Sequence, residues 1–288
     1  MLLIWSATGG KTGAAGMEHT PSAKGPGKAH LRSRVASRAA IGAGALALAF
    51  LAYGAMRDYR LQRELVQTSP DRIPSDIRLV RYGNAVGGKA FAGNCATCHG
   101  ADMKGSQTRG VPNLTDNVWL YDYGRVSDIE RTLLYGIRSG HGRSHNVTDM
   151  PAIGLQKALD PGEIRDVIAY TLSLSNHQAD AAAVERGSMI FQDKGVCYDC
   201  HSRDATGIPD YGAPNLTDDE WLYGGDAAML YKSIYDGRHG LCPAWIDKLS
   251  FATIRALAVY VHSMSKESPE SPNNRSASSA ERQSPGHG

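Results

Sequence analysis

The sequence predicts an all-α protein in which one N-terminal apolar helix is followed by two small helical domains in tandem. Three observations support this prediction: an uncharged run of 18 residues near the N-terminus, a duplication of the chain that follows, and apolar residues spaced at helical rather than alternating intervals. A chain of 288 residues has room for one membrane segment and two domains of about 100 residues each.

The uncharged run AAIGAGALALAFLAYGAM, residues 39–56, is long enough to cross a bilayer as a helix. We expect a single-pass anchor in the inner (cytoplasmic) membrane over residues 35–57, preceded by a disordered cytoplasmic segment at 1–34. Residues 1–38 hold six Lys or Arg and one acid. This basic excess places the N-terminus in the cytoplasm and the rest of the chain in the periplasm. A cleaved signal peptide is the alternative, since an apolar core behind arginines also suits a signal.

The body of the chain is mildly acidic. Residues 58–288 hold 24 basic and 28 acidic side chains, a balance that argues against nucleic-acid binding. Residues 266–288, rich in Ser, Pro and charge, predict a disordered tail. Residues 58–81 are expected to be a linker between the anchor and the first domain.

Two motifs recur at one offset and define the duplication. CATCH at residues 95–99 returns as CYDCH, and GVPNLTDNVWLY returns as GAPNLTDDEWLY, both 102 residues later. Such a repeated pair marks two copies of one domain, which we place at residues 82–176 and 183–265. The copies differ in length at one place: nine residues separate Gly140 from Met150, whereas one residue separates Gly240 from Cys242 in the second copy.

Each copy ends in the same amphipathic helix. In the first copy the start signal DPGE precedes an apolar face formed by Ile164, Val167, Ile168 and Leu172. Leu257, Val261 and Met264 repeat that face in the second copy. The rest of each copy is largely loop, which predicts a small all-α unit that needs a bulky group at its centre.

The motif Cys-x-x-Cys-His is typical of c-type haem attachment. Two thiols one helical turn apart each form a thioether to a vinyl group, and the adjacent His binds the iron as its proximal ligand. A zinc ribbon needs its two cysteine pairs about 15 to 20 residues apart, whereas 98 residues lie between the pairs here. The sequence therefore predicts two covalently bound haem c groups, held by Cys95, Cys98 and His99 and by Cys197, Cys200 and His201.

The sixth ligand of each iron is expected to come from the same copy as its motif. Met150, in DMPAI, lies 51 residues after His99 and is the expected thioether ligand of the first iron; such a soft neutral donor suits an electron carrier. The matching place in the second copy holds Cys242, in GRHGLCPAWI. A thiolate there would favour ferric iron and lower the reduction potential. Alternatively the second iron stays open, or its ligand is His239, Met229 or Met264.

Taken together, these residues resemble the membrane-anchored dihaem cytochrome c subunit (subunit III) of cbb3-type cytochrome c oxidases. The resemblance covers roughly residues 70–265 and rests on both PNLTD segments followed by WLY, on YGIRSGH, on PAW and on IRALAVYVHSMS. It implies two class I cytochrome c domains, with Pro112 and Pro214 beside the proximal histidines and Trp119 and Trp221 near the haem propionates. The chain departs from the family in lacking the WDGI-x-E stretch and an aromatic-rich anchor, and in having Cys242 where the family has Met.

The resemblance implies a membrane-anchored dihaem electron carrier with no catalytic residue of its own. Its implied partners are a haem–copper oxidase catalytic subunit, a monohaem cytochrome subunit, and a donor cytochrome or quinol-oxidising complex. Two alternatives start from Cys242: a dihaem redox enzyme acting on thiosulfate or peroxide, and a haem sensor that binds small ligands at the second iron.

Overall fold

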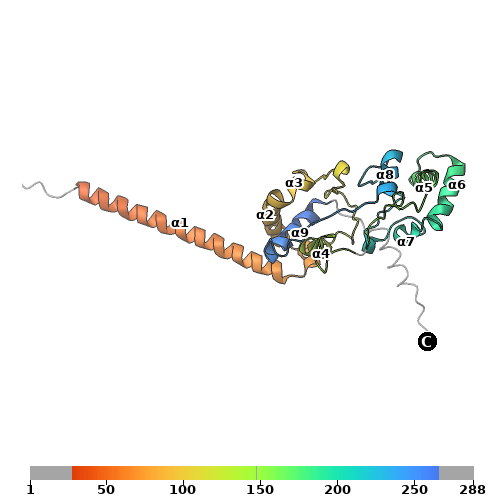
Figure 1. Ribbon diagram of the computed structural model, residues 1–288. Helices are drawn as coiled ribbons and strands as arrows, with labels where there is room; N and C mark the ends of the chain where they lie inside the picture. The colour runs from red at the N-terminus through yellow and green to blue at the C-terminus, as the bar shows by residue number, and fades with distance from the viewer. Residues whose placement is uncertain (1–27, 147, 266–288) are drawn as a thin grey trace, which may run out of the picture. The chain divides into compact units, whose positions relative to one another are not determined.

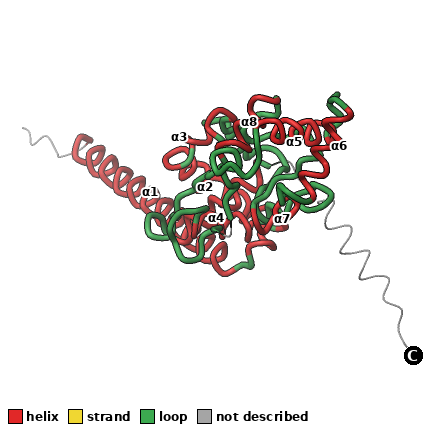
Figure 2. The backbone as a smooth tube through the Cα atoms, turned by 45° about the vertical axis from the view of Figure 1, so that its right-hand side comes forward, coloured by secondary structure: helices red, strands yellow, loops and turns green. Residues whose placement is uncertain are grey.

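Helices make up the regular structure, as predicted. The computed structural model describes the backbone of residues 28–146 and 148–265, with side chains from residue 41 onward; the predicted disordered tail at 266–288 and residues 1–27 lie outside the described residues. Within the described ranges there are isolated bridges but no strand, as Figure 2 shows. The α-helices are α1 (Lys28–Gln67), α2 (Ile77–Asn94), α3 (Ala96–His99), α4 (Val126–Tyr135), α5 (Pro161–Leu174), α6 (Ala181–Gln192), α7 (Tyr198–His201), α8 (Ala227–Asp236) and α9 (Phe251–Met264), with the 3-10 helices η1 (Pro70–Ser75), η2 (Gln107–Arg109) and η3 (Pro209–Tyr211).

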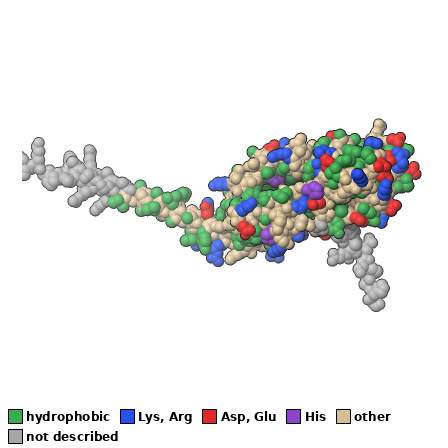
Figure 3. Space-filling model, in the orientation of Figure 1, with side chains coloured by type: hydrophobic (Ala, Val, Ile, Leu, Met, Phe, Trp, Pro, Cys, Tyr) green, Lys and Arg blue, Asp and Glu red, His purple; other side chains and the backbone are tan. Residues whose placement is uncertain are grey.

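Helix α1 contains the run in which we predicted a transmembrane anchor. It is a single helix of 40 residues, and the apolar side chains of its residues 41–60, such as Phe50 and Leu51, are exposed (Figure 3). Where side chains are described, no helix is both long and apolar enough to cross a membrane; the side chains of residues 35–40 lie outside that set. The helix also begins earlier than expected, at Lys28, within the segment predicted to be disordered.

Residues 58–81 are ordered rather than a linker. The end of α1, then η1, then the start of α2 occupy this stretch almost without interruption. The reason is burial, because Leu65 and Ile73 are fully buried and Leu79 is nearly so, all in one core cluster. The surrounding charges obscure this pattern in the sequence, since only every third or fourth residue of a helix faces the core.

A buried ion pair holds the end of α1. Arg255 on α9 pairs with Glu130 on α4, and both side chains are at most 10% exposed. The same guanidinium donates hydrogen bonds to the backbone oxygens of Leu65 (3.1 Å) and Thr68 (2.8 Å). Arg255 therefore satisfies carbonyl groups that a helix end leaves without partners, and it joins α1 to helices from both repeats.

The two repeats do not pack as separate sequential domains. Helix α9 packs mainly against α2 and α4, whereas α5 packs mainly against α6 and α8. Figure 1 accordingly shows α2, α3, α4 and α9 together, which we call the first bundle, and α5, α6, α7 and α8 together, which we call the second bundle. Each bundle takes its last amphipathic helix from the other repeat. The expected tandem packing is thus replaced by an exchange of helices.

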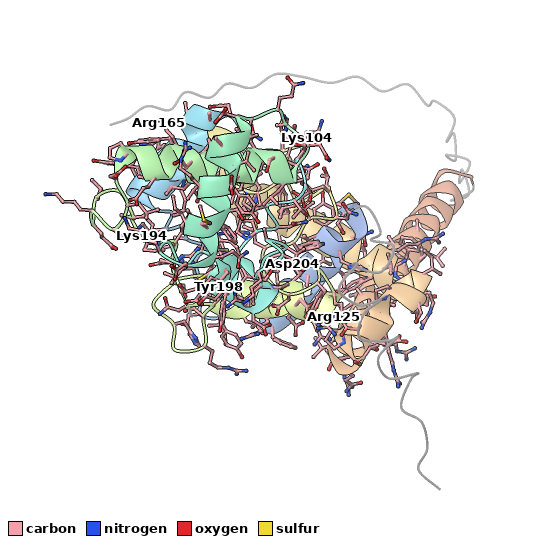
Figure 4. The ribbon with its side chains drawn as sticks, turned by 90° about the vertical axis from the view of Figure 1, so that its right-hand side faces the viewer. Lys104, Arg125, Arg165, Lys194, Tyr198 and Asp204 are labelled. Carbon is pink, nitrogen blue, oxygen red and sulfur yellow. The ribbon has the colours of Figure 1, made fainter. Side chains whose placement is uncertain are left out.

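The short connection between α5 and α6 explains the exchange. Only residues 175–180 separate the two helices, and so short a connection places consecutive helices side by side. Two ion pairs reinforce this contact: Arg186 with Asp166 at 2.7 Å, and Lys194, labelled in Figure 4, with Glu163. Because α6 packs against α5, α2 packs against α9 instead.

Equivalent glycines mark the two closest helix contacts. A Cβ atom at Gly87 on α2 would lie 2.2 Å from the backbone oxygen of Ala256 on α9, and one at Gly187 on α6 would lie 2.0 Å from that of Asp166 on α5. These distances exclude any side chain, so both contacts require glycine. The two glycines are 100 residues apart, which shows that the duplication preserved the contact although the helices were exchanged.

The predicted start of α5 is confirmed. Asp160 accepts hydrogen bonds from the backbone nitrogens of Gly162 and Glu163, and the Glu163 side chain accepts one from the backbone nitrogen of Asp160. This reciprocal capping box, with Pro161 at the first helical position, fixes where the helix begins. Ile164, as predicted, is fully buried on the inner face.

Candidate haem centres

The first Cys-x-x-Cys-His motif begins where α2 ends. Cys95 is the N-cap of α3 and His99 is its last residue, so the two cysteines and the histidine project from a single helical turn. The ring of His99 lies 6.5 Å from that of Phe91, a buried residue of α2. Arg109 donates a hydrogen bond of 2.8 Å to the backbone oxygen of Cys98 and so braces the motif from the following loop.

The second motif has the same construction. Cys197 is the N-cap of α7 and His201 is its last residue. The half-buried Tyr198 of this motif, labelled in Figure 4, lies beneath the guanidinium of Arg203 at 4.3 Å from ring centroid to Cζ. The second motif is therefore braced by a side chain from its own loop, as the first is by Arg109.

Both motif histidines are held in the tautomer that leaves Nε2 free to bind iron. His99 Nδ1 lies 3.2 Å from the carbonyl oxygen of Pro112, and His201 Nδ1 lies 3.1 Å from that of Pro214. A carbonyl oxygen can only accept, so Nδ1 carries the hydrogen and Nε2 keeps its lone pair. The expectation that these prolines lie beside the motif histidines agrees with this geometry.

Burial disfavours the charged forms of both motif histidines and of the first cysteine of each motif. Desolvation lowers the pKa of His99 and of His201, so both rings are neutral near pH 7. Desolvation also raises the pKa of the Cys95 and Cys197 thiols to about 11. A neutral imidazole with a free Nε2 beside two thiols one helical turn apart fits the donor set that c-type haem requires.

The segments that contain Met150 and Cys242 cross between the bundles. After α4, Ile137 exchanges two backbone hydrogen bonds with Cys242, of 2.9 and 3.0 Å. After α8, the backbone nitrogen of Arg238 donates to the oxygen of Met150 at 3.1 Å. In both cases a glycine with positive φ makes the close approach possible: Gly136 faces Cys242 and Gly237 faces Met150.

This crossing bears on the expected pairing of motif and distal residue, because the segments of Met150 and Cys242 each reach across to the other repeat. Cys242 lies against the end of α4 in the first bundle, where it pairs with Ile137, and burial, with the nearby thiols of Cys95 and Cys98 as a smaller cause, raises its pKa to about 11. Met150 instead pairs with Arg238, just after the end of α8 in the second bundle. The expectation that each distal residue serves its own copy rests on motif and residue lying in one stretch of sequence, whereas the helix exchange carries the last helix of each repeat into the other bundle.

The tyrosines of the two WLY segments cross in the same way. A Cβ atom at Gly110, in the loop after the first motif, would lie 2.0 Å from the ring of Tyr223, and one at Gly212 would lie 2.1 Å from the ring of Tyr121. Each loop thus receives the tyrosine of the other repeat. Together with the distal segments, these tyrosines join the loops that follow the two motifs into one structure.

Comparisons with known proteins agree with this geometry. The family model described as "Cytochrome c" matches residues 85–175, and that described as "Cytochrome C oxidase, cbb3-type, subunit III" matches residues 182–261. The chain is 39% identical over 204 residues to the cbb3-type cytochrome c oxidase subunit CcoP of Cereibacter sphaeroides, covering 71% of this chain and 69% of that protein.

Two further relatives bear related names. Subunit FixP of a Bradyrhizobium species is 44% identical over 196 residues, covering 67% of this chain and 64% of that protein. Subunit CcoP of Azospirillum brasilense is 39% identical over 206 residues, covering 69% and 68%. The chain thus spans about two thirds of the length of these relatives.

The chain belongs to the CcoP/FixP family of cbb3-type cytochrome c oxidase subunits.

Membership of the CcoP/FixP family confirms the resemblance seen in the sequence and the expectation of two covalently bound haem c groups. It favours electron transfer over the redox-enzyme and sensor alternatives. The structure also shows residues that sequence reasoning missed. Arg138 and Tyr121 lie at the contact between the two bundles, and Arg138 Nη1 donates to Tyr121 Oη at 3.0 Å. In the sequence, Arg138 stands within the motif YGIRSGH. That motif does not indicate that Arg138 has a partner, Gly240, in the other repeat.

Proposed function

We propose that this chain is the dihaem electron-transfer subunit of a cbb3-type cytochrome c oxidase. The observation that supports this most directly is the pair of matching motifs, each with two cysteines and a neutral histidine oriented by a prolyl carbonyl. Haem c, when bound, supplies a one-electron couple between ferrous and ferric iron. The chain's own part in this function is to bind and orient the haem groups and to exclude water from them.

The proposed ligand sets follow the crossed geometry. Cys95, Cys98 and His99 hold the first haem, with Cys242 as distal ligand; Cys197, Cys200 and His201 hold the second haem, with Met150 as distal ligand. A thiolate donor stabilises ferric iron and a thioether stabilises ferrous iron. The first haem should therefore have the lower potential, the reverse of the order that the sequence order of the ligands implies.

Helix α1 is proposed to attach the subunit to the inner (cytoplasmic) membrane. Its support is the uncharged run of residues 39–56 within one long helix, and the six Lys or Arg in residues 1–38, which place the N-terminus in the cytoplasm and the haem bundles in the periplasm. Alkaline carbonate extraction of the full chain, with a chain beginning at Asp58 as control, tests this. Release of the full chain into the soluble fraction would contradict it.

The proposed partners are the haem–copper catalytic subunit, a monohaem cytochrome subunit, and a donor cytochrome or quinol-oxidising complex. Purification of the tagged chain from solubilised membranes tests the assignment. We expect two haems per chain, a co-purifying haem–copper subunit, and reduction by a donor cytochrome c. A chain that purifies alone with two haems and turns over thiosulfate or peroxide would overturn the assignment in favour of a redox enzyme.

A variant with only one haem tests the ligand of the first iron. In Cys197→Ala/Cys200→Ala the first haem alone is attached, and its ferric spectrum should be low-spin with thiolate character. Adding Cys242→Ala should abolish that character, and Cys242→Met should convert it to a thioether spectrum. Thiolate character that is absent from this variant and present in Cys95→Ala/Cys98→Ala would contradict the crossed assignment.

A further inference from the structure

The side chain of Arg138 donates hydrogen bonds to both backbone segments that precede the proposed distal ligands, Met150 and Cys242. Arg138 Nε donates to the backbone oxygen of Gly240 at 2.6 Å, two residues before Cys242. Its Nη1 donates to the backbone oxygen of Thr148 at 3.2 Å, two residues before Met150. Its guanidinium therefore spans the place where the two crossed segments meet.

The neighbouring contacts strengthen this connection. Arg138 Nε lies 3.2 Å from Oδ1 of Asp149, and His239 Nδ1 lies 3.1 Å from Oδ2 of the same carboxylate. The Arg138 side chain is 19% exposed, and its backbone has φ of +48°. A non-glycine residue in the left-handed region costs energy and persists only where the surroundings hold it.

The equivalent arginine of the second repeat does not make this connection. Arg238 donates to the hydroxyl of Ser233 at 2.9 and 2.8 Å, and its guanidinium lies 4.0 Å from the centroid of the Tyr223 ring. These side-chain contacts stay within its own repeat, and it is the backbone nitrogen of Arg238, which a substitution leaves in place, that donates to Met150. The duplication thus provides two arginines at matching positions, of which one connects the distal segments and the other serves as a natural control.

The length difference between the repeats accounts for this asymmetry. Thr148 and Asp149, which bind Arg138, belong to the nine residues that the first repeat carries between Gly140 and Met150. The second repeat has only Leu241 at that place. The additional residues therefore supply the acceptors through which Arg138 holds the Met150 segment.

We propose that Arg138 is a positioning residue that couples the two haem centres by fixing the Met150 and Cys242 segments relative to each other. The inference rests on the proposed function, because it takes these two sulfur atoms as distal ligands. Each acceptor is at most two residues, about 7 Å of extended chain, from a ligand. A shift of one ligand segment is therefore transmitted to the other through one guanidinium and two short pieces of backbone.

A double-mutant cycle on the full holo-chain tests the coupling. Cys242→Ala changes the first haem, and the reporters are the potential and the thioether spectrum of the second haem, which Cys242 does not ligate. With Arg138 present we expect the redox equilibrium constant of the second haem to change at least fivefold, within the range usual for coupled sites. In the Arg138→Gln background the change should fall below twofold.

Two further variants separate coupling from general damage. Arg238→Gln should leave the fivefold change in place, and Arg138→Lys, which keeps the charge but loses the fork-shaped donor group, should reduce it. If Arg138→Gln does not fold, judged by its circular dichroism, Arg138→Lys serves as the test variant. The inference would be overturned if the potential and spectrum of the second haem did not change in Cys242→Ala, or if they changed equally in every background.

The same samples separate this failure from failure of the proposed function. If both haems are attached and both distal ligands show in the spectra, but Cys242→Ala does not change the second haem, only the proposed role of Arg138 is disproved. Absence of one haem, or of either sulfur ligand from its iron, would instead remove the ligand assignments on which the role depends.

Discussion

A methyl group at position 87 tests the closest helix contact of the first bundle. In Gly87→Ala the new Cβ atom would lie 2.2 Å from the backbone oxygen of Ala256, whereas ordinary contact begins at 3.4 Å. Helix α2 would have to move away from α9 by the difference, 3.4 minus 2.2, or 1.2 Å. Because Phe91 and Leu257 hold these helices in the core, we expect overpacking to cost about 1–3 kcal/mol.

A second glycine on the same helix provides the matched control. Gly93 has nothing within 4 Å of its ideal Cβ position, so Gly93→Ala should gain about 1 kcal/mol from helix propensity alone. Because Gly87→Ala gains the same propensity, the two variants should differ by the overpacking cost alone, about 1–3 kcal/mol. At about 2–4 °C per kcal/mol for a chain of this size, their midpoints of thermal unfolding should differ by about 2–12 °C. Circular dichroism at the helical band measures this. Equal midpoints for the two variants would refute the packing argument.

Three other predictions follow from described contacts. Glu130→Gln should lower the free energy of unfolding by about 3–5 kcal/mol in denaturant titrations, because it leaves Arg255 charged and buried; a loss under 1 kcal/mol would count against it. Gly187→Ala should destabilise the second bundle as Gly87→Ala does the first, which thermal unfolding checks. Burial lowers the pKa of His145 below its ordinary value of 6.5, so its contribution to stability is complete above pH 6.5 and is lost as the pH falls; unfolding curves of His145→Gln should depend less on pH between 6.5 and 5.

Local features of the fold could be predicted because each depends on a few neighbouring residues. The start of α5 follows from Asp160, Pro161 and Glu163, which lie within four residues of one another. The motif at Cys95 likewise fixes two thiols and a histidine on one helical turn, whatever the rest of the chain does. The Leu65 contact was missed because its partners, including Arg255, lie far along the chain.

The pairing of distal ligands could not be predicted from the repeats themselves. Helices α5 and α9 present the same apolar face, so α2 could pack against either one, and the pattern that reveals the duplication cannot distinguish them. The distinguishing information lies in residues 175–180, since a connection this short keeps α5 beside α6. Counting that connection, rather than comparing motifs, would have placed α9 and the Cys242 segment with the first bundle.

The crossed segments alter how this protein can evolve. Duplicated domains ordinarily diverge separately, because a change in one copy leaves the other intact. Here a substitution in the second half of the gene, for example at Cys242, acts on a segment that pairs with Ile137 of the first half. Neither half can be deleted to leave a complete cytochrome. Selection therefore acts on the two halves as one inherited unit, although the sequence still records two.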